Sequence, residues 1–229
     1  KSSEMKAQGI DVINMSVGEP DFMTPGFIKE AGKKAIDDNY SKYSPVPGYP
    51  VLREAIARKL KRENGLDYAA SEILVGTGGK QGVCNAILAL VNPGDEVVIP
   101  APYWVSYPQM VKLAGGTPVI VPAGIGQDFK ITAAQFEAAV TPKTKLVILC
   151  SPSNPTGSVY SEEELGELAK VVLAHDDLFV LSDEIYEHIN YIGGHSSIAA
   201  CPGMKERTVV CNGVSKAYAM TGWRLGWVA

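Results

Sequence analysis

The sequence predicts an α/β fold in three layers, with helices on both faces of a sheet of seven mostly parallel strands. Two observations carry this prediction. From residue 51 onward, amphipathic helical stretches alternate with short apolar runs, which is the order that builds a parallel sheet covered by helices. Most of the seven apolar runs are rich in β-branched residues or leucine and are bounded by proline or glycine, as buried strands are.

The first elements are a helix, a strand and a second helix. Residues Val51–Asn64 form an amphipathic helix that Gly65 ends. Its apolar face is formed by Leu52, Ile56 and Leu60. A short strand at Ile73–Val75 is followed by a glycine-rich turn and by the helical stretch Gln81–Val91.

The remaining strands are apolar runs of four or five residues. They are expected at Glu96–Ile99, Thr117–Val121, Leu146–Cys150, Leu178–Leu181, Thr208–Cys211 and Arg224–Val228. Between the third and the fourth of these, Ser161 is followed three residues later by Glu164, which is the signature of a capping box. This signature predicts a helix that runs to about Ala174.

The first 44 residues have a different character, because proline and glycine interrupt them in stretches such as VGEPDFMTPG. We therefore expect residues 1–44 to form an N-terminal segment that wraps over the sheet or reaches a small domain or a partner subunit. Residues 45–229 are expected to form one large domain.

The composition excludes several classes of function. A net charge of -4 gives no reason to expect nucleic acid or an anionic membrane as a partner. The four cysteines contain no C-x-x-C pair and indicate buried thiols in a reducing compartment: Cys84, Cys150, Cys201 and Cys211. There is no apolar run of membrane-spanning length and no visible signal peptide, so we expect a cytoplasmic protein.

Several familiar site patterns fail on inspection. In GTGGKQG, Gln81 stands where a dinucleotide-binding loop has its third glycine, and Lys80 is not followed by the Ser or Thr of a P-loop. Ala217 replaces the last glycine of a nucleophile elbow in GVSKA. The three histidines, His175, His188 and His195, lack metal-ligand spacing, so the sequence predicts no metal site.

The strongest pattern is a lysine beside phosphate-binding groups. Lys216 follows an apolar strand, next to Ser215 and eight residues before Arg224. A lysine at a strand end is most often a solvated surface charge. Here, however, Ser215 and Arg224 can bind a phosphate and Lys216 can form a Schiff base with an aldehyde. That combination is what pyridoxal phosphate requires.

Polar residues after other strands can complete such a site, because the carboxyl ends of parallel strands meet at one edge of a sheet. Gly79 and Lys80 open a helix whose N–H groups can hold phosphate. Asp183 can pair with a protonated pyridine nitrogen, or can simply cap a helix. Tyr186, three residues later, can reach the phenolic oxygen of the cofactor.

Two further residues have an ordinary structural alternative. In SPSNPTG, a proline on each side of Ser153-Asn154 predicts a stiff loop that orients the Asn154 amide, although the motif can also be turn chemistry alone. Trp104 in PAPYWVSYP is either a core residue or an aromatic plate that stacks on a flat ring.

These motifs resemble those of a known family. SPSNPTG, SDEIYEH and NGVSKAYAMTGWRLG look like the motifs of the class I aminotransferases of pyridoxal-phosphate fold type I. GGKQ and PAPYWVSYP resemble in particular the bacterial aspartate aminotransferases, and the similarity runs from Val17–Asp21 to the last residue. The resemblance implies the large domain of such an enzyme, with the strand at Arg224–Val228 antiparallel.

The resemblance also implies a role for each site residue. Lys216 would hold pyridoxal 5'-phosphate covalently and carry the proton, and Asp183 would pair with its ring nitrogen. The other cofactor-binding residues would be Asn154 and Tyr186 at the phenolic oxygen, Trp104 on the ring, and Gly79, Lys80, Ser215 and Arg224 at the phosphate. The substrate would contact Gly18, Lys80, Trp104 and Asn154. Tyr43 would reach the phosphate of the neighbouring subunit, which implies a homodimer.

The implied reaction moves an amino group from aspartate or glutamate to a 2-oxo acid such as 2-oxoglutarate. Alternatives on the same fold are an aromatic or prephenate aminotransferase and a carbon–sulfur lyase. An alternative of another class is a non-catalytic ligand-binding domain of a regulator. Family members continue into a small domain that clamps the substrate carboxylate. We therefore expect that domain to be absent from this chain, and the fragment to be inactive by itself.

Overall fold

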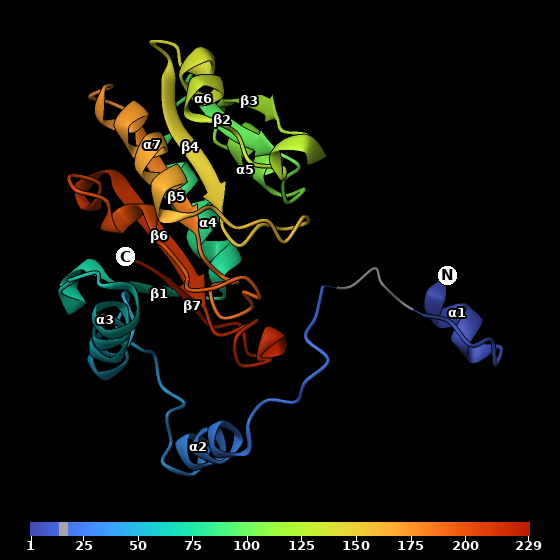
Figure 1. Ribbon diagram of the computed structural model, residues 1–229. Helices are drawn as coiled ribbons and strands as arrows, with labels where there is room; N and C mark the ends of the chain where they lie inside the picture. The colour runs from blue at the N-terminus through green and yellow to red at the C-terminus, as the bar shows by residue number, and fades with distance from the viewer. Residues whose placement is uncertain (14–17) are drawn as a thin grey trace.

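A seven-stranded sheet forms the centre of the computed structural model, which describes residues 1–13 and 18–229 (Figure 1). The strands lie in the order β1-β7-β6-β5-β4-β2-β3. Their bounds are β1 Leu74–Gly76, β2 Glu96–Ala101, β3 Thr117–Pro122, β4 Thr144–Cys150, β5 Phe179–Asp183, β6 Thr208–Gly213 and β7 Gly226–Val228. All seven predicted strands are present, within a few residues of their expected bounds.

The strand directions confirm a mostly parallel sheet. Strands β2 to β6 run parallel to one another, whereas β7 is antiparallel to both of its neighbours, β1 and β6. The last strand therefore has the antiparallel direction that the family resemblance implied. It is shorter than expected, because Arg224 lies outside it in the left-handed region with a φ of 56°.

The three predicted helices are confirmed as α3 (Pro50–Asn64), α4 (Gly79–Leu90) and α7 (Glu162–Leu173). Gly65 ends α3 in the left-handed conformation, with a φ of 68°. The capping box at the start of α7 forms as expected, since the Ser161 hydroxyl accepts from the Glu164 N–H and the Glu164 carboxylate accepts from the Ser161 N–H. Two helices had not been predicted, α5 (Tyr107–Leu113) and α6 (Ala133–Ala139), and each is only seven residues long.

The helices form two outer layers. On one face of the sheet, α4 and α5 pack on side chains such as Val97, Ile99 and Leu181. On the other face, α6 and α7 cover the alternate residues, which include Val98 and Val180, and α3 packs over β6 and β7. The three-layer arrangement is therefore the predicted one, and it leaves the carboxyl ends of β4, β5 and β6 uncovered by helices.

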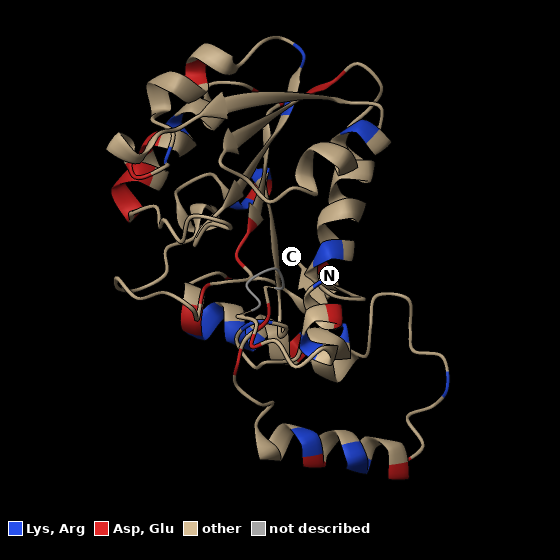
Figure 2. Ribbon diagram, turned by 90° about the vertical axis from the view of Figure 1, so that its right-hand side faces the viewer, with Lys and Arg blue, Asp and Glu red and all other residues tan. Residues whose placement is uncertain are grey.

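The two helices of the N-terminal segment stand away from these layers, although residues 18–24 contact the turn after β6. Neither α1 (Ser2–Ala7) nor α2 (Gly26–Asp37), both of which the structure describes in full, has a buried residue. Figures 1 and 2 show α2 apart from the sheet, and the colours of Figure 2 show basic and acidic residues mixed along its ribbon. Its apolar residues are correspondingly exposed, including Phe27 at 74% and Ile36 at 73%. In the parts of the chain that are described, no helix combines the length and the apolar character needed to cross a membrane.

Candidate active site

A cavity of about 490 Å³ opens at the carboxyl ends of β4, β5 and β6. Its walls bring together almost all the residues singled out from the sequence. It is lined by Gly18, Glu19, Gly79, Lys80, Trp104, Tyr107, Cys150, Asn154, Asp183, Ile185, Tyr186, Ser215, Lys216, Thr221, Gly222 and Arg224. Tyr43 is the exception, since it is fully exposed and does not line this cavity. Val17, the first residue of the N-terminal motif, lies outside the described residues.

Asp183 is the last residue of β5, and its side chain is buried. The Tyr107 hydroxyl donates to its Oδ2 at 2.7 Å, and the Ile185 N–H donates to its Oδ1 at 3.3 Å. Burial raises the pKa of Asp183 from its ordinary value near 3.8 to about 6, although these two hydrogen bonds oppose the rise. The residues after Asp183 form turns rather than a helix, so Asp183 does not cap one.

Sequence reasoning missed Tyr107, the donor to Asp183. Tyr107 is only 2% exposed, and its ring meets that of Trp104 edge-on, with centroids 5.3 Å apart. The pKa of its hydroxyl is raised well above 10, because it is buried beside the Asp183 carboxylate. The spacing of three residues between two aromatic side chains, Trp104 and Tyr107, is the signal in the sequence that could have indicated their contact.

Cys150 was also not predicted as a site residue. It ends β4 directly opposite Asp183 of β5. Burial, with a smaller contribution from the negative charge of Asp183, raises the pKa of the Cys150 thiol to about 12. Cys150 is therefore a neutral thiol at physiological pH and does not act as a thiolate nucleophile.

Lys216 lies in the turn after β6 and is partly buried. Its ammonium donates to the Gly18 carbonyl and lies 5.8 Å from the centre of the Tyr186 ring. Partial burial lowers the pKa of Lys216, and Arg224 adds to this effect while Glu19 opposes it. A lowered pKa leaves more of the amine neutral, which is the form that attacks a carbonyl carbon.

A cradle for an anion lies at the start of α4. Gly78 precedes the helix with a φ of 83°, and a side chain there would collide with the Arg224 guanidinium. The close fit continues in β7, where a side chain on Gly226 would collide with the backbone of Gly78 and Gly79. The helix N-terminus and the Arg224 guanidinium thus lie together, and Ser215 lines the same cavity.

Two pairs of predicted residues are in contact around the cavity. The Asn154 side-chain amide lies 3.4 Å from the Tyr186 hydroxyl. The Lys80 ammonium lies 5.2 Å from the centre of the Trp104 ring. Lys80 is exposed and Trp104 half-buried, so this pair forms the outer wall of the cavity.

The arrangement fits a planar heterocycle that carries a cationic ring nitrogen and a phosphate. Both groups that donate to Asp183 are neutral, so the buried carboxylate lacks the cation that would stabilise its charged form. At the other end, the cradle of Gly78 and Arg224 suits a phosphate, and the primary amine of Lys216 belongs to the same cavity wall. A cavity of about 490 Å³ is of the size that binds such a ligand.

The chain is similar to a known family and to several known proteins. The family model described as "Aminotransferase class I and II" matches residues 10–229. An aspartate/prephenate aminotransferase of Cereibacter sphaeroides is 54% identical over all of this chain, and an aspartate aminotransferase of Pinus pinaster is 53% identical. The chain spans 58% of the first of these relatives and 47% of the second.

Solved structures share the fold at high similarity. The aspartate aminotransferase of Thermus thermophilus with maleate superimposes with a TM-score of 0.96 at 45% identity. An aromatic aminotransferase from Pyrococcus horikoshii gives a TM-score of 0.93 at 48% identity. The two alignments cover 100% and 96% of this chain, and 59% of each solved chain.

The raised pKa of Asp183 predicts a specific pH dependence of stability in the cofactor-free protein. The folded state holds this proton more tightly than the unfolded state, so the stabilisation is complete below pH 4 and is lost as the pH rises through 6. Relative to Asp183→Asn, the free energy of unfolding should fall by about 3 kcal/mol between pH 4 and pH 7. Urea unfolding of both proteins across this range measures the difference, and parallel pH profiles would contradict the assignment.

Proposed function

This chain belongs to the class I and II aminotransferase family, and we propose that the protein containing it moves an amino group from aspartate or glutamate to a 2-oxo acid such as 2-oxoglutarate. In this proposal, pyridoxal 5'-phosphate binds in the cavity at the carboxyl ends of the strands. One observation carries the proposal: Lys216, Asp183 and Arg224 line the same cavity, and each offers the group that one part of this cofactor needs.

The cofactor, when bound, supplies an aldehyde that condenses with amines and a protonated ring that stabilises negative charge on the substrate carbon. Asp183 pairs with the ring nitrogen and keeps it protonated. Gly79, Lys80, Ser215 and Arg224 hold the phosphate region, and Trp104 covers the ring. These assignments are supported by the neutral donors around Asp183 and by the fit of Gly78 against Arg224.

Lys216 is the catalytic residue in this account. Its amine holds the cofactor before substrate arrives, and afterwards it removes the proton from the substrate α-carbon and returns it at the cofactor. The lowered pKa of Lys216 favours the neutral amine that a proton acceptor requires. Asn154 and Tyr186 hold the phenolic oxygen and so keep the ring in one orientation, which their mutual contact supports.

The proposed substrate contacts lie at the mouth of the cavity. Gly18 lies beside the substrate carboxylate, with Trp104 and Asn154 on the substrate's other sides. Lys80 recognises the distal carboxylate of an acidic substrate, and its exposed ammonium beside Trp104 supports this role. An aromatic or prephenate substrate is the second candidate, since relatives carry such names and the Trp104 ring offers an apolar surface.

A homodimer is part of the proposal. Tyr43 is fully exposed, and the segment around it carries further exposed apolar side chains, including Phe22 at 80% and Val46 at 93%. Exposed apolar groups gathered in one segment are typical of a contact surface. We propose that Tyr43 reaches the phosphate site of the partner subunit. A cytoplasmic location is also proposed, on the ground that all four cysteines are free thiols.

Lys216 should carry the cofactor. Borohydride reduction of the cofactor-loaded protein should fix the pyridoxyl group on the peptide that contains Lys216, because reduction makes the bond to the lysine permanent. Peptide mapping by mass spectrometry reads the position of the label. Lys80→Arg should keep the label and Lys216→Ala should lose it. A label on Lys80 in the unmodified protein would refute the assignment.

Lys80 should determine the preference for acidic substrates. Loss of its charged contact in Lys80→Met should lower kcat/KM for aspartate by about 100-fold, while kcat/KM for phenylalanine changes little. Steady-state assays that detect the new amino acid measure both values. Lys112→Met, which removes an exposed lysine of α5, is the control. An equal loss for both substrates would mean that Lys80 serves the phosphate alone.

Tyr43 should act across the dimer. Tyr43→Ala subunits should bind pyridoxal 5'-phosphate weakly, and Lys216→Ala subunits should be inactive. A hybrid of the two has one site with Lys216 from one subunit and Tyr43 from the other, so mixing should restore activity and tight binding at that site. Absence of any recovery in isolated hybrids would place Tyr43 in its own subunit's site instead.

A further inference from the structure

The turn that follows β5 has two functional sides. Asp183 and Tyr186 line the cavity, whereas Glu184 and Glu187, one residue after each of them, are buried outside it. The backbone explains this alternation, because the Glu187 N–H donates to the Glu184 carbonyl at 3.0 Å in a tight turn. Residues three apart in such a turn share a side. Two buried carboxylates therefore lie behind the two residues that face the ligand.

Glu184 is held by the loop that follows this turn. Its carboxylate accepts hydrogen bonds from the Ser182 hydroxyl at 2.9 Å and the Ser197 hydroxyl at 2.6 Å. The Nε2 atom of His195 lies 2.9 Å from the second carboxylate oxygen. With its side chain 1% exposed, Glu184 is bound on both oxygens by groups from β5 and from residues 195–197.

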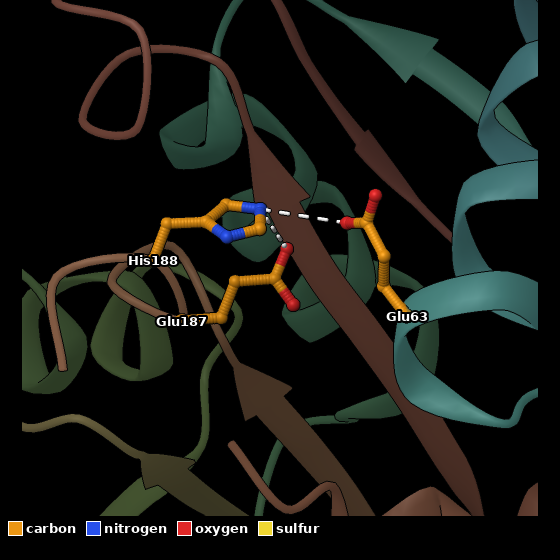
Figure 3. A group of neighbouring side chains, drawn as sticks. All are labelled: Glu63, Glu187 and His188. Carbon is orange, nitrogen blue, oxygen red and sulfur yellow. Dashed lines mark ion pairs between the residues drawn. The ribbon is translucent and has the colours of Figure 1, made fainter. Parts of the chain in front are cut away.

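Glu187 is held by helix α3. The Lys59 ammonium contacts one carboxylate oxygen, and the Asn64 amide donates to the other at 2.8 Å. Figure 3 shows His188 pointing between Glu187 and Glu63, with Nε2 at 3.2 Å and 3.6 Å from their carboxylate oxygens. The Glu187 side chain is 4% exposed, so its charge is compensated by protein groups rather than by water.

The carboxylates of Glu184 and Glu187 form one cluster with His195 and Lys59, which we call the anchor of the turn. Oxygen atoms of Glu184 and Glu187 and a ring nitrogen of His195 all lie within 4.8 Å of one another. Lys59 supplies the positive charge at the α3 end, where it also lies 3.6 Å from Glu63. A divalent cation between Glu63 and Glu187 would have to displace this ammonium, so the group is best understood as an ion-pair network.

We propose that Glu184 and Glu187 are positioning residues, which fix the turn that presents Asp183 and Tyr186 to the cavity by tying its far side to residues 195–197 and to α3. The inference rests on the proposed function for its catalytic consequence, but not for its structural content. Neither carboxylate lines the cavity, so neither touches the ligand. Each acts through its neighbour: Glu184 through Asp183, and Glu187 through Tyr186.

Tyr107 and Tyr186 can each report on the position of the turn. The Tyr107 hydroxyl donates to Asp183, and the Tyr186 hydroxyl contacts Asn154, so the two phenols sense any displacement of the turn. With 3-fluorotyrosine incorporated into the full-length, cofactor-free protein, ¹⁹F NMR resolves both rings. The resonances are assigned by their loss in Tyr107→Phe and Tyr186→Phe. This ¹⁹F NMR measurement requires neither catalysis nor bound cofactor.

Glu184→Gln should shift the Tyr107 resonance, and Glu187→Gln should shift the Tyr186 resonance. A displacement of a site residue by about 1 Å costs up to about 100-fold in rate, so kcat should fall by that order while the KM for the amino acid changes less. The affinity for pyridoxal 5'-phosphate, measured by absorbance titration, should also weaken. Glu187→Asp should recover part of each effect, because it keeps the charge that Lys59 requires.

Two controls separate positioning from general stability. Glu167→Gln breaks an exposed Lys–Glu ion pair on α7 and should leave both resonances unchanged. Val172→Ala removes two fully buried methyl groups of α7 from the core and should lower the unfolding temperature without moving either resonance.

If Glu184→Gln and Glu187→Gln lower the unfolding temperature but leave both resonances and the cofactor affinity as they are, the carboxylates are structural only. If the unmodified protein neither binds the cofactor nor transaminates while the resonances still shift, the proposed function fails and the anchor stands.

Discussion

The burial of one carboxylate, that of Asp183, is the constraint on which the rest of the site depends. A charged group away from water requires hydrogen bonds or an opposite charge. The protein supplies two neutral hydrogen-bond donors, the Tyr107 hydroxyl and the Ile185 N–H. They compensate only part of the cost of burying the charge, so the pKa of Asp183 remains raised. Burial likewise raises the pKa of Cys150 on the neighbouring strand β4, so this group stays a thiol. The buried carboxylate would therefore be stabilised by a cation placed against it, which is what the proposed ligand offers.

The sheet explains how residues far apart in sequence meet this carboxylate. Parallel strands β4, β5 and β6 deliver Asn154, Asp183 and Lys216 to one edge, each in the loop after its strand or at its end. The antiparallel direction of β7 then brings the chain back, with Arg224 in the turn just before the strand. Topology, rather than local sequence, thus brings the amine, the carboxylate and the guanidinium into one cavity.

Signals that act over a few residues made most of the helices and strands predictable from the sequence. The Gly65 helix stop, the Ser161–Glu164 capping box and the apolar strands act over a few residues, so the sequence displays them directly. Tyr107 escaped prediction because α5 is too short for a periodic pattern to emerge. The Lys59–Glu187 pair could not be predicted either, since it joins positions 128 residues apart and each partner alone resembles an ordinary surface charge. Sequence patterns thus reveal the residues that line the cavity more readily than the buried charges packed behind them.

The contact between Gly226 and the start of α4 has a consequence for biosynthesis. The anion cradle combines a turn after β1 with the last strand of the sheet, and β1 pairs with β7 alone, from residue 74 to residue 228. As the chain leaves the ribosome, β1 is made long before β7, the strand with which it pairs in the described sheet. Closing so long a loop is slow compared with forming local helices. The cradle is therefore completed late in folding, and until then the unpaired edge of β1 is exposed to chaperones and to aggregation.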